Sequence, residues 1–228
     1  MDRYFINSNY SISSKSESMS KIVCIYPQDD TTAFLRPLCD HICATFGAVE
    51  VGYDINGDNS QIEIIHNSIK DAKDIFFLGH GESTCLYASI INGAQLFNKD
   101  NISLLKDKQL FLLACNSEQF ITKYKLPEAI GFGFLPTSLH DARRVRKLHS
   151  MRIEHLQKDD INSYNTALVD ALINTLSETT MTDSHLFAER LKFSTCDKIV
   201  KILLQKETPN YRIVADMLYY LYKDMNIS

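Results

Sequence analysis

Two residues that could form a catalytic pair, His80 and Cys115, each follow a short apolar run. The runs read IFFLGHG over residues 75–81 and LFLLACNS over residues 110–117. A free cysteine is mostly a neutral thiol at neutral pH, and an adjacent imidazole can accept its proton to give the nucleophilic thiolate. The same imidazole can then protonate a leaving amine, so the pair favours acyl transfer. We expect His80 to act as general acid and base and Cys115 to act as the nucleophile.

Both apolar runs are predicted to be buried strands of a parallel sheet, because the sequence between them is long enough for a hairpin and a crossover helix. Ligands of such sheets bind at the carboxyl ends of the strands, where His80 and Cys115 stand. Gly81 permits a substrate to approach the backbone closely. Its N–H group and that of Cys115 are therefore the predicted donors to a tetrahedral oxyanion.

Short apolar runs alternate with longer amphipathic segments from Lys21 onward, which is the pattern of a parallel sheet covered by helices. The elements expected are strands over residues 22–26, 49–53, 74–78, 109–114 and 129–134, helices over 34–46, 60–69 and 102–105, and a hairpin over 85–97 around Asn92-Gly93. Residues 139–226 are predicted to be mostly helical. The length of 228 residues suits one domain with an appendage. We expect a flexible Ser-rich leader over 1–20, an α/β core over 21–136 and a C-terminal helical region packed on the core over 137–228.

Composition and charge exclude several classes of protein. Apolar residues make up 45% and charged residues 23%, as in soluble globular proteins. The net charge of −4 gives no overall positive field to attract nucleic acid or an anionic membrane, and no apolar stretch has the length of a membrane span. Six cysteines are too sparse for a disulfide scaffold. We expect reduced thiols in the cytoplasm, with no direct nucleic-acid or membrane partner.

The ordered blocks, His-Gly and then Ala-Cys after apolar runs, resemble the pattern shared by caspases, legumains, gingipains, clostripain and separase. Residues 20–136 are most similar to the bacterial caspase-like peptidases of the CHAT family, with counterparts of the turn after the cysteine and of a later Gly-Phe-Gly segment. The resemblance implies a caspase-like three-layer α/β/α fold with a mostly parallel sheet. It also implies a cysteine endopeptidase that needs no cofactor, with His80 and Cys115 as catalytic residues and Gly81 as an oxyanion donor.

The same resemblance implies a biological setting. Bacterial relatives act in anti-phage defence or regulated cell death, where a sensor releases the protease and a protein substrate is cleaved, for example a gasdermin-like pore former or a regulatory protein. The sequence has no tetratricopeptide repeats of its own, so we expect an activating or sensor partner.

Asp29 and Asp30 are the predicted substrate-binding residues. Several family members that cut after Arg or Lys hold that side chain with an acidic residue near the end of the first strand, and a buried carboxylate can bind a guanidinium through two hydrogen bonds. The alternative is helix capping by Asp30 or Thr31. Specificity for acidic residues would need a buried arginine, for which Arg36 is the nearby candidate. We therefore expect cleavage after Arg or Lys.

Two further groups invite a functional interpretation. The basic stretch from Arg143 to Arg152 could be an autoprocessing site, a docking surface or a solvated helix face. Cys39 and Cys43 stand one helical turn apart, but His41 between them points elsewhere and no second ligand pair follows, so no metal site is expected.

Two other functions fit the same motif. The first is a catalytically silent caspase-like adaptor in a signalling complex. The second is a small-molecule acyl hydrolase or transamidase that uses the same His–Cys pair.

Overall fold

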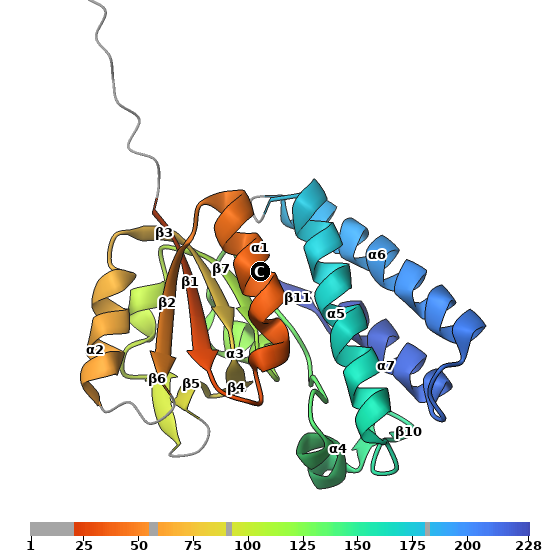
Figure 1. Cartoon of the computed structure of the whole chain (residues 1–228). Coiled ribbons are helices and arrows are strands. Elements are labelled where there is room, and N and C mark those ends of the chain that lie inside the picture. Colours follow the sequence, from red (N-terminus) through yellow and green to blue (C-terminus); the bar gives the residue numbers. More distant parts are fainter. Residues whose placement is uncertain (1–20, 55–58, 90–92, 181–182) are drawn as a thin grey trace, which may run out of the picture.

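The computed structural model of the protein describes residues 21–54, 59–89, 93–180 and 183–228 (Figure 1). The predicted leader over residues 1–20 and the predicted turn at Asn92 lie outside the described residues. None of the described helices is long and apolar enough to cross a membrane.

A six-stranded sheet forms the centre of the molecule (Figure 1). Its strands lie in the order β2-β1-β3-β7-β8-β11, and all neighbours pair in parallel except β11, which runs antiparallel to β8. The strand bounds are β1 Lys21–Gln28, β2 Val49–Asp54, β3 Ala72–Leu78, β7 Gln109–Leu113, β8 Ala129–Gly131 and β11 Asn226–Ile227. Because parallel strands end at the same edge, the residues that follow β1, β3 and β7 are brought to one end of the sheet.

Helices cover both faces of this sheet, as the continuous apolar runs of β3 and β7 require. One face is covered by a group of helices that also pack on one another. They are α1 (Arg36–Phe46), α5 (Lys158–Glu178), α6 (Ser184–Gln205) and α7 (Tyr211–Lys223). The other face is covered by α2 (Asn59–Ser68) and α3 (Ser117–Tyr124). The fold is α/β with a mostly parallel sheet, and its arrangement is compatible with three α/β/α layers.

Short elements complete the described chain. They are the antiparallel sheet of β4 (His80–Glu82), β5 (Cys85–Ser89) and β6 (Ala94–Phe97), the hairpin of β9 (Lys147–Leu148) and β10 (Met151–Arg152), helix α4 (Leu139–Val145), and the 3₁₀ helices η1 (Ala33–Leu35) and η2 (Ile102–Leu105). β4 begins directly after β3, so the small sheet starts at the edge where the central strands end.

Alternation along β3 and β7 sends successive side chains to opposite faces of the sheet. Phe76 and Phe111 pack in the core under α1 and α5, whereas Phe77 and Leu112 pack in the core shared with α2 and α3. The ring of Phe111 lies 5.6 Å from that of Phe76 and 5.4 Å from that of Phe132, centroid to centroid. Both strands are thus fixed from two sides, which makes their ends rigid supports.

Most of the predicted elements are confirmed. The five predicted strands, the hairpin over 85–97, the short helix at 102–105 and the predominantly helical character of 139–226 all appear. The fifth strand is shorter than predicted, because only Ala129–Gly131 of residues 129–134 is a strand. The helix over 36–46 ends before Gly47, which adopts a left-handed φ of +66° at the C-cap. Pro37 lies in its first turn, as expected.

The structure also contains elements that were not predicted: strand β4, helix α3, the hairpin β9–β10 and the terminal strand β11. Helix α3 has only eight residues and follows Asn116, whose φ of +56° turns the chain sharply out of β7. Strand β11 has two residues, and it forms only because β8 offers a free edge more than ninety positions earlier. Residues 137–228 therefore contribute a strand to the central sheet in addition to helices.

Gly131 of β8 lies against the first turn of α3, which leaves no room for a side chain. A Cβ atom here would lie 2.6 Å from the carbonyl oxygen of Ser117 and 2.8 Å from the backbone nitrogen of Glu118, so the helix would have to shift. We expect Gly131→Ala to lower the free energy of unfolding by about 2–3 kcal/mol in urea denaturation, because all three nearest atoms belong to the backbone.

Gly93→Ala is the matched control for this substitution. Its added Cβ meets no described atom within 4 Å, so its cost should be limited to roughly 1 kcal/mol for the left-handed φ of +67°. Equal losses of stability in the two variants would contradict the proposed packing of α3 on β8.

Candidate active site

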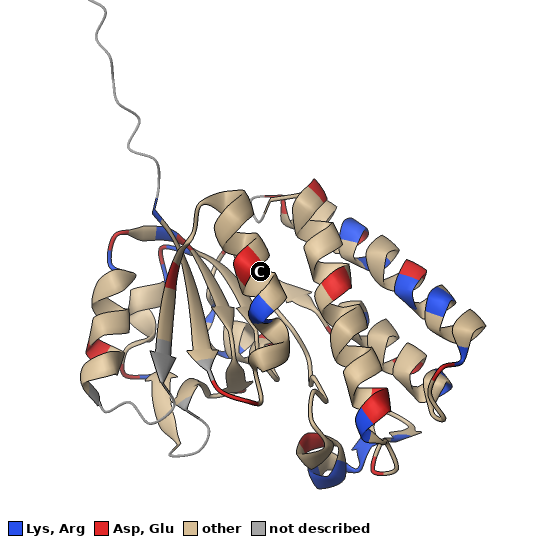
Figure 2. Ribbon diagram, viewed as in Figure 1, with Lys and Arg blue, Asp and Glu red and all other residues tan. Residues whose placement is uncertain are grey.

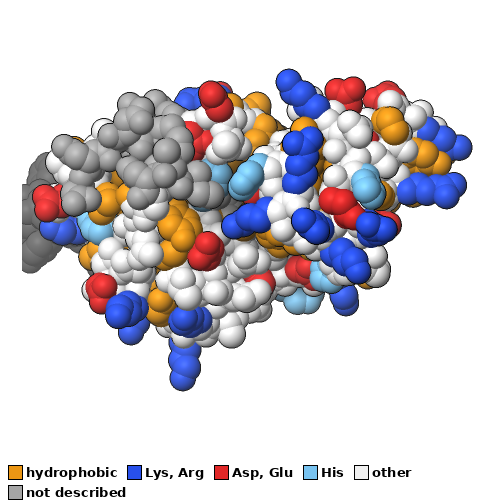
Figure 3. All heavy atoms as spheres, turned by 90° about the horizontal axis from the view of Figure 1, so that it is seen from below, with side chains coloured by type: hydrophobic (Ala, Val, Ile, Leu, Met, Phe, Trp, Pro, Cys, Tyr) orange, Lys and Arg blue, Asp and Glu red, His pale blue; other side chains and the backbone are white. Residues whose placement is uncertain are grey.

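A cavity of about 430 Å³ opens at the edge where β3 and β7 end. His80, Gly81 and Cys115 all line it, together with residues of the β1–α1 loop and of the segment after β8. The structure thus brings together the two residues that the sequence analysis paired, and it places the predicted oxyanion glycine between them. Figure 3 views the molecule from this side, toward which the arrows of β1 and β2 point in Figure 1.

Cys115 is held at a tight strand-to-helix turn. The Asn116 N–H donates to the carbonyl of Gly133 at 3.1 Å, and the buried Ser117 hydroxyl donates to the carbonyl of Leu112 at 2.6 Å. The same hydroxyl accepts from the Phe132 N–H at 2.8 Å. These bonds tie the turn to both β7 and the segment after β8, so the backbone of Cys115 has little freedom to move.

The Cys115 thiol is neutral in this arrangement. Its Sγ donates to the carbonyl oxygen of Leu135 at 3.4 Å, and burial raises the pKa of the thiol to about 12 from an ordinary value of 9.0. The N–H groups of Ala114 and Asn116 donate to carbonyls, but that of Cys115 donates to no described residue. This N–H group is therefore available to a ligand in the cavity.

His80 is held by the loop that follows β1. Its Nε2 lies 2.8 Å from Oγ1 of Thr31 and 3.6 Å from Oδ2 of Asp29. Its Nδ1 has no hydrogen bond to any described residue. The Thr31 hydroxyl donates its own proton to Asp29, so it can only accept from Nε2. The loop therefore favours the tautomer that carries its proton on Nε2 and leaves Nδ1 as an acceptor.

Asp29 is buried beside His80, with its side chain only 4% exposed. Its Oδ1 accepts from the N–H groups of Thr31 at 2.8 Å and Thr32 at 3.0 Å, and also from the Thr31 hydroxyl. Its Oδ2 has no hydrogen-bond partner and faces Nε2 of His80. Burial raises the pKa of Asp29, but the neighbouring imidazole of His80 and the hydrogen bonds from Thr31 lower it by more, so that the pKa is about 2. The carboxylate is therefore a permanent negative charge behind the imidazole.

Gly81 packs directly on the backbone of the Cys115 turn. A Cβ atom at Gly81 would lie 3.2 Å from the carbonyl oxygen of Cys115 and 3.0 Å from Cβ of Ala114. Only a glycine fits here without displacing its neighbours. His80 and Cys115 themselves form no hydrogen bond with each other, since each has another partner.

The structure gives the two predicted substrate-binding residues different surroundings. Neither Asp29 nor Asp30 lines the cavity. Asp29 faces His80 and Thr31, and Asp30 is exposed. The acidic residues that line the cavity are Glu82 and Asp141.

Sequence reasoning missed the contact of His80 with Thr31 and Asp29. The pattern Asp-x-Thr after a strand does indicate a turn closed by the Asp side chain, and Asp29 forms one by accepting from the N–H groups of Thr31 and Thr32. The alternative of helix capping by Asp30 or Thr31 is wrong, because Thr32 is the N-cap of η1 and forms no side-chain cap bond. No local signal shows that this turn lies beside a histidine 49 positions later.

The basic stretch lies next to the cavity. Arg143, Arg144, Arg146 and Lys147 are exposed and form no ion pair with another described residue, whereas Arg152 pairs with Glu154 at 2.7 Å. Arg144 lines the cavity. Figure 2 shows these cations at α4 and the segment that follows, and Figure 3 shows Lys and Arg side chains gathered on the same face.

No family model matches the chain, and searches of curated proteins and of solved structures find no match either. The fold and the site by themselves define the class: an α/β protein with a histidine and a cysteine in one cavity at the edge of a mostly parallel sheet. Any functional conclusion must rest on the geometry of that cavity.

The buried charge of Asp29 should make stability depend on pH in acid. Its folded pKa of about 2 lies below the ordinary 3.8, so its contribution is complete above about pH 4 and is lost as the pH falls through 2. We expect the wild type to lose up to about 2 kcal/mol more than Asp29→Asn between pH 4 and pH 2, measured by urea denaturation. Asp30→Asn, at the exposed neighbour, should follow the wild-type curve. If Asp29→Asn lost as much stability as the wild type between pH 4 and pH 2, the buried contact of Asp29 with His80 would be contradicted.

Proposed function

We propose that the protein is a cysteine endopeptidase in which Cys115 is the nucleophile and His80 the general acid and base. The observation that carries this proposal is that both side chains line one cavity of about 430 Å³, with Nε2 of the imidazole held by a buried acidic loop. The α/β fold, with its mostly parallel sheet, supports assignment to the caspase-like clan, and the CHAT family is the proposed branch within it.

The buried loop defines the direction of proton transfer. Asp29 and Thr31 keep the proton of the neutral imidazole on Nε2, so Nδ1 is the basic nitrogen. When a substrate enters, the Cys115 thiol leaves the carbonyl of Leu135 and transfers its proton to Nδ1. The resulting imidazolium is stabilised by the carboxylate of Asp29, and catalytic hydrogen bonds commonly tighten only in such complexes.

The thiolate then attacks the carbonyl carbon of the peptide bond, and the carbonyl oxygen becomes a tetrahedral oxyanion. The free N–H of Cys115 and that of Gly81 are the proposed donors to this oxygen. Collapse of the intermediate breaks the carbon–nitrogen bond, and the imidazolium gives its proton to the leaving amine. Water, deprotonated by His80, hydrolyses the thioester and restores the thiol.

A silent adaptor is the second candidate, and one observation favours it. In the structure the Cys115 thiol bonds to Leu135, its pKa is raised to about 12 by burial, and it has no bond to His80. In the peptidase proposal this is a resting arrangement, and an activating partner or the substrate converts it to one in which the thiol contacts His80.

The proposed setting is a bacterial defence or cell-death system in the cytoplasm, with a sensor protein as the trigger.

Active-site labelling separates these two functions. A peptidyl acyloxymethyl ketone should alkylate Cys115 alone, as located by peptide mass spectrometry, and Cys115→Ala should abolish the adduct. His80→Ala should slow the labelling by about 100-fold or more, because the general base is lost.

Cys196→Ala is the matched control, since Cys196 is half-buried like Cys115 but lies on α6. It should label at the wild-type rate. Equal labelling of Cys115 and Cys196, or a His80→Ala variant that labels as fast as the wild type, would favour the silent adaptor.

Cleavage after Arg or Lys is the proposed specificity. This proposal is supported by two acidic residues that line the cavity, Glu82 and Asp141, which can attract a basic side chain. In a peptide-library profile we expect Arg or Lys before the cut, and Glu82→Gln should lower kcat/KM for these peptides by about 10-fold, the effect of roughly 1.4 kcal/mol. Asp30→Asn should leave the profile unchanged. A profile with Asp or Glu before the cut would instead assign substrate recognition to the nearby cations, such as Arg144.

A further inference from the structure

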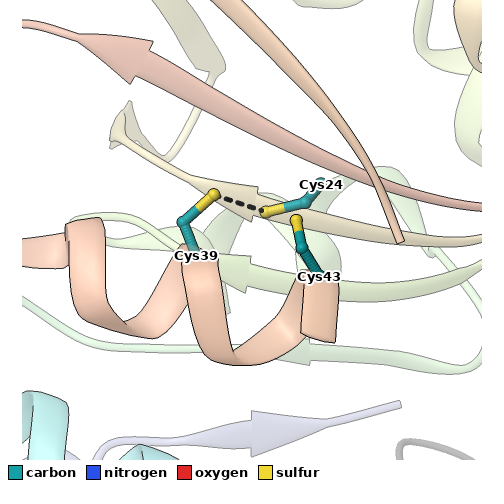
Figure 4. A group of neighbouring side chains, drawn as sticks. All are labelled: Cys24, Cys39 and Cys43. Carbon is teal, nitrogen blue, oxygen red and sulfur yellow. Dashed lines mark hydrogen bonds between the residues drawn. The ribbon is translucent and has the colours of Figure 1, made fainter. Parts of the chain in front are cut away.

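Three cysteines form a cluster between β1 and α1 that the proposed reaction does not use. Cys24 projects from the strand, and Cys39 and Cys43 project toward it from successive turns of the helix (Figure 4). The three Sγ atoms all lie within 4.8 Å of one another, and those of Cys24 and Cys39 are 3.6 Å apart. Cys24 and Cys39 are completely buried, whereas Cys43 is half-buried and gives the cluster an opening toward solvent.

The spacing of these sulfurs is close to that of a metal site. An ion bound about 2.3 Å from each thiolate holds the sulfurs about 3.8–4.0 Å apart. The observed separations differ from this value by less than an ångström. Residues four apart on a helix share a face, so the fold itself directs Cys39 and Cys43 to the same point.

The donor set selects the kind of ion. All three donors are sulfur, and among the described residues no histidine or carboxylate joins the group. Glu50 pairs with Cys24 in the β1–β2 register, but its two carboxylate oxygens accept hydrogen bonds from Arg36 at 2.8 and 2.9 Å. His41 is also excluded as a ligand of the cluster, because its Nε2 lies 3.3 Å from Oγ of Ser177. Structural zinc is almost always bound by four ligands, whereas soft sulfur ligands select monovalent copper.

We propose that Cys24, Cys39 and Cys43 form a binding site for a thiophilic monovalent ion, Cu⁺. Binding replaces thiol protons, which pass to solvent, by sulfur–copper bonds, and the copper stays monovalent throughout. The guanidinium of Arg36, which lies over the ring of Tyr26, favours the thiolate of Cys39, but its partner Glu50 opposes this effect. Arg36 also pairs with Asp40, so the charge of the thiolates is offset mainly by the bound ion itself.

This site would also influence the cavity. The cluster joins β1 to α1, and the loop between these two elements carries Asp29 and Thr31. A bound ion would therefore restrain both ends of the loop that holds His80. The metal site stands on the sulfur geometry alone and is independent of the proposed peptidase activity.

Copper competition under anaerobic conditions tests this site on the full chain. The protein is titrated with Cu⁺ in the presence of a chromogenic Cu⁺ chelator, and native mass spectrometry counts the bound ions. We expect one equivalent to be withdrawn from the chelator and the Tm to rise with copper. Cys43→Ser, at the half-buried position, should weaken the binding by at least about 10-fold and remove the rise in Tm.

Cys115→Ser and Cys196→Ser are the matched controls and should bind copper like the wild type. Circular dichroism of each metal-free variant verifies that it is folded. The proposal is overturned if Cys43→Ser binds copper with wild-type affinity, or if Cys115→Ser abolishes the binding. Retention of Zn²⁺ but not Cu⁺ against a chelator would overturn the assignment of the ion.

Discussion

The parallel pairing of β3 with β7 is the constraint on which the candidate site depends. Leu78 pairs with Leu113 at the last position of the register, and the Gly79 N–H donates to the carbonyl of Leu113 at 3.1 Å. This bond extends the ladder by one residue, so the two chains leave the sheet side by side. His80 and Cys115 are the residues that follow, and burial of both strands on two faces keeps their ends in place.

The imidazole of His80 and the thiol of Cys115 have different electrostatic surroundings. The imidazole has a buried, permanently charged carboxylate behind it, with Oδ2 of Asp29 3.6 Å from Nε2. The thiol lies in an apolar part of the cavity, where burial disfavours the thiolate. Transfer of the proton from sulfur to imidazole would place a cation beside the Asp29 carboxylate and a thiolate at a buried position. The resting state of the site is accordingly neutral at sulfur, and reactivity depends on how far the thiol moves toward His80.

The sequence predicted what depends on local patterns. Continuous apolar runs identified the buried strands, and Gly47 marked a helix end, because burial on two faces and a left-handed cap leave clear signatures in nearby residues. The expectation that His80 and Cys115 lie at one sheet edge followed from their positions after two buried parallel strands and from the length of the segment between them. The contact of Asp29 with His80 did not, since it joins two loops that follow different strands. Cys24 is likewise separated from Cys39 by the whole β1–α1 connection, so no local pattern indicated that its Sγ lies close to those of Cys39 and Cys43.

The central claim is that His80 activates Cys115, and the pH profile of inactivation by a peptidyl acyloxymethyl ketone tests it most directly. The reagent occupies the cavity, so the rate constant reports the thiol in its substrate-bound environment. The wild-type rate should already be on a plateau near neutral pH, whereas in His80→Ala it should rise only in the alkaline range of a buried thiol with a pKa of about 12. Superimposable profiles for the two proteins would contradict the claim.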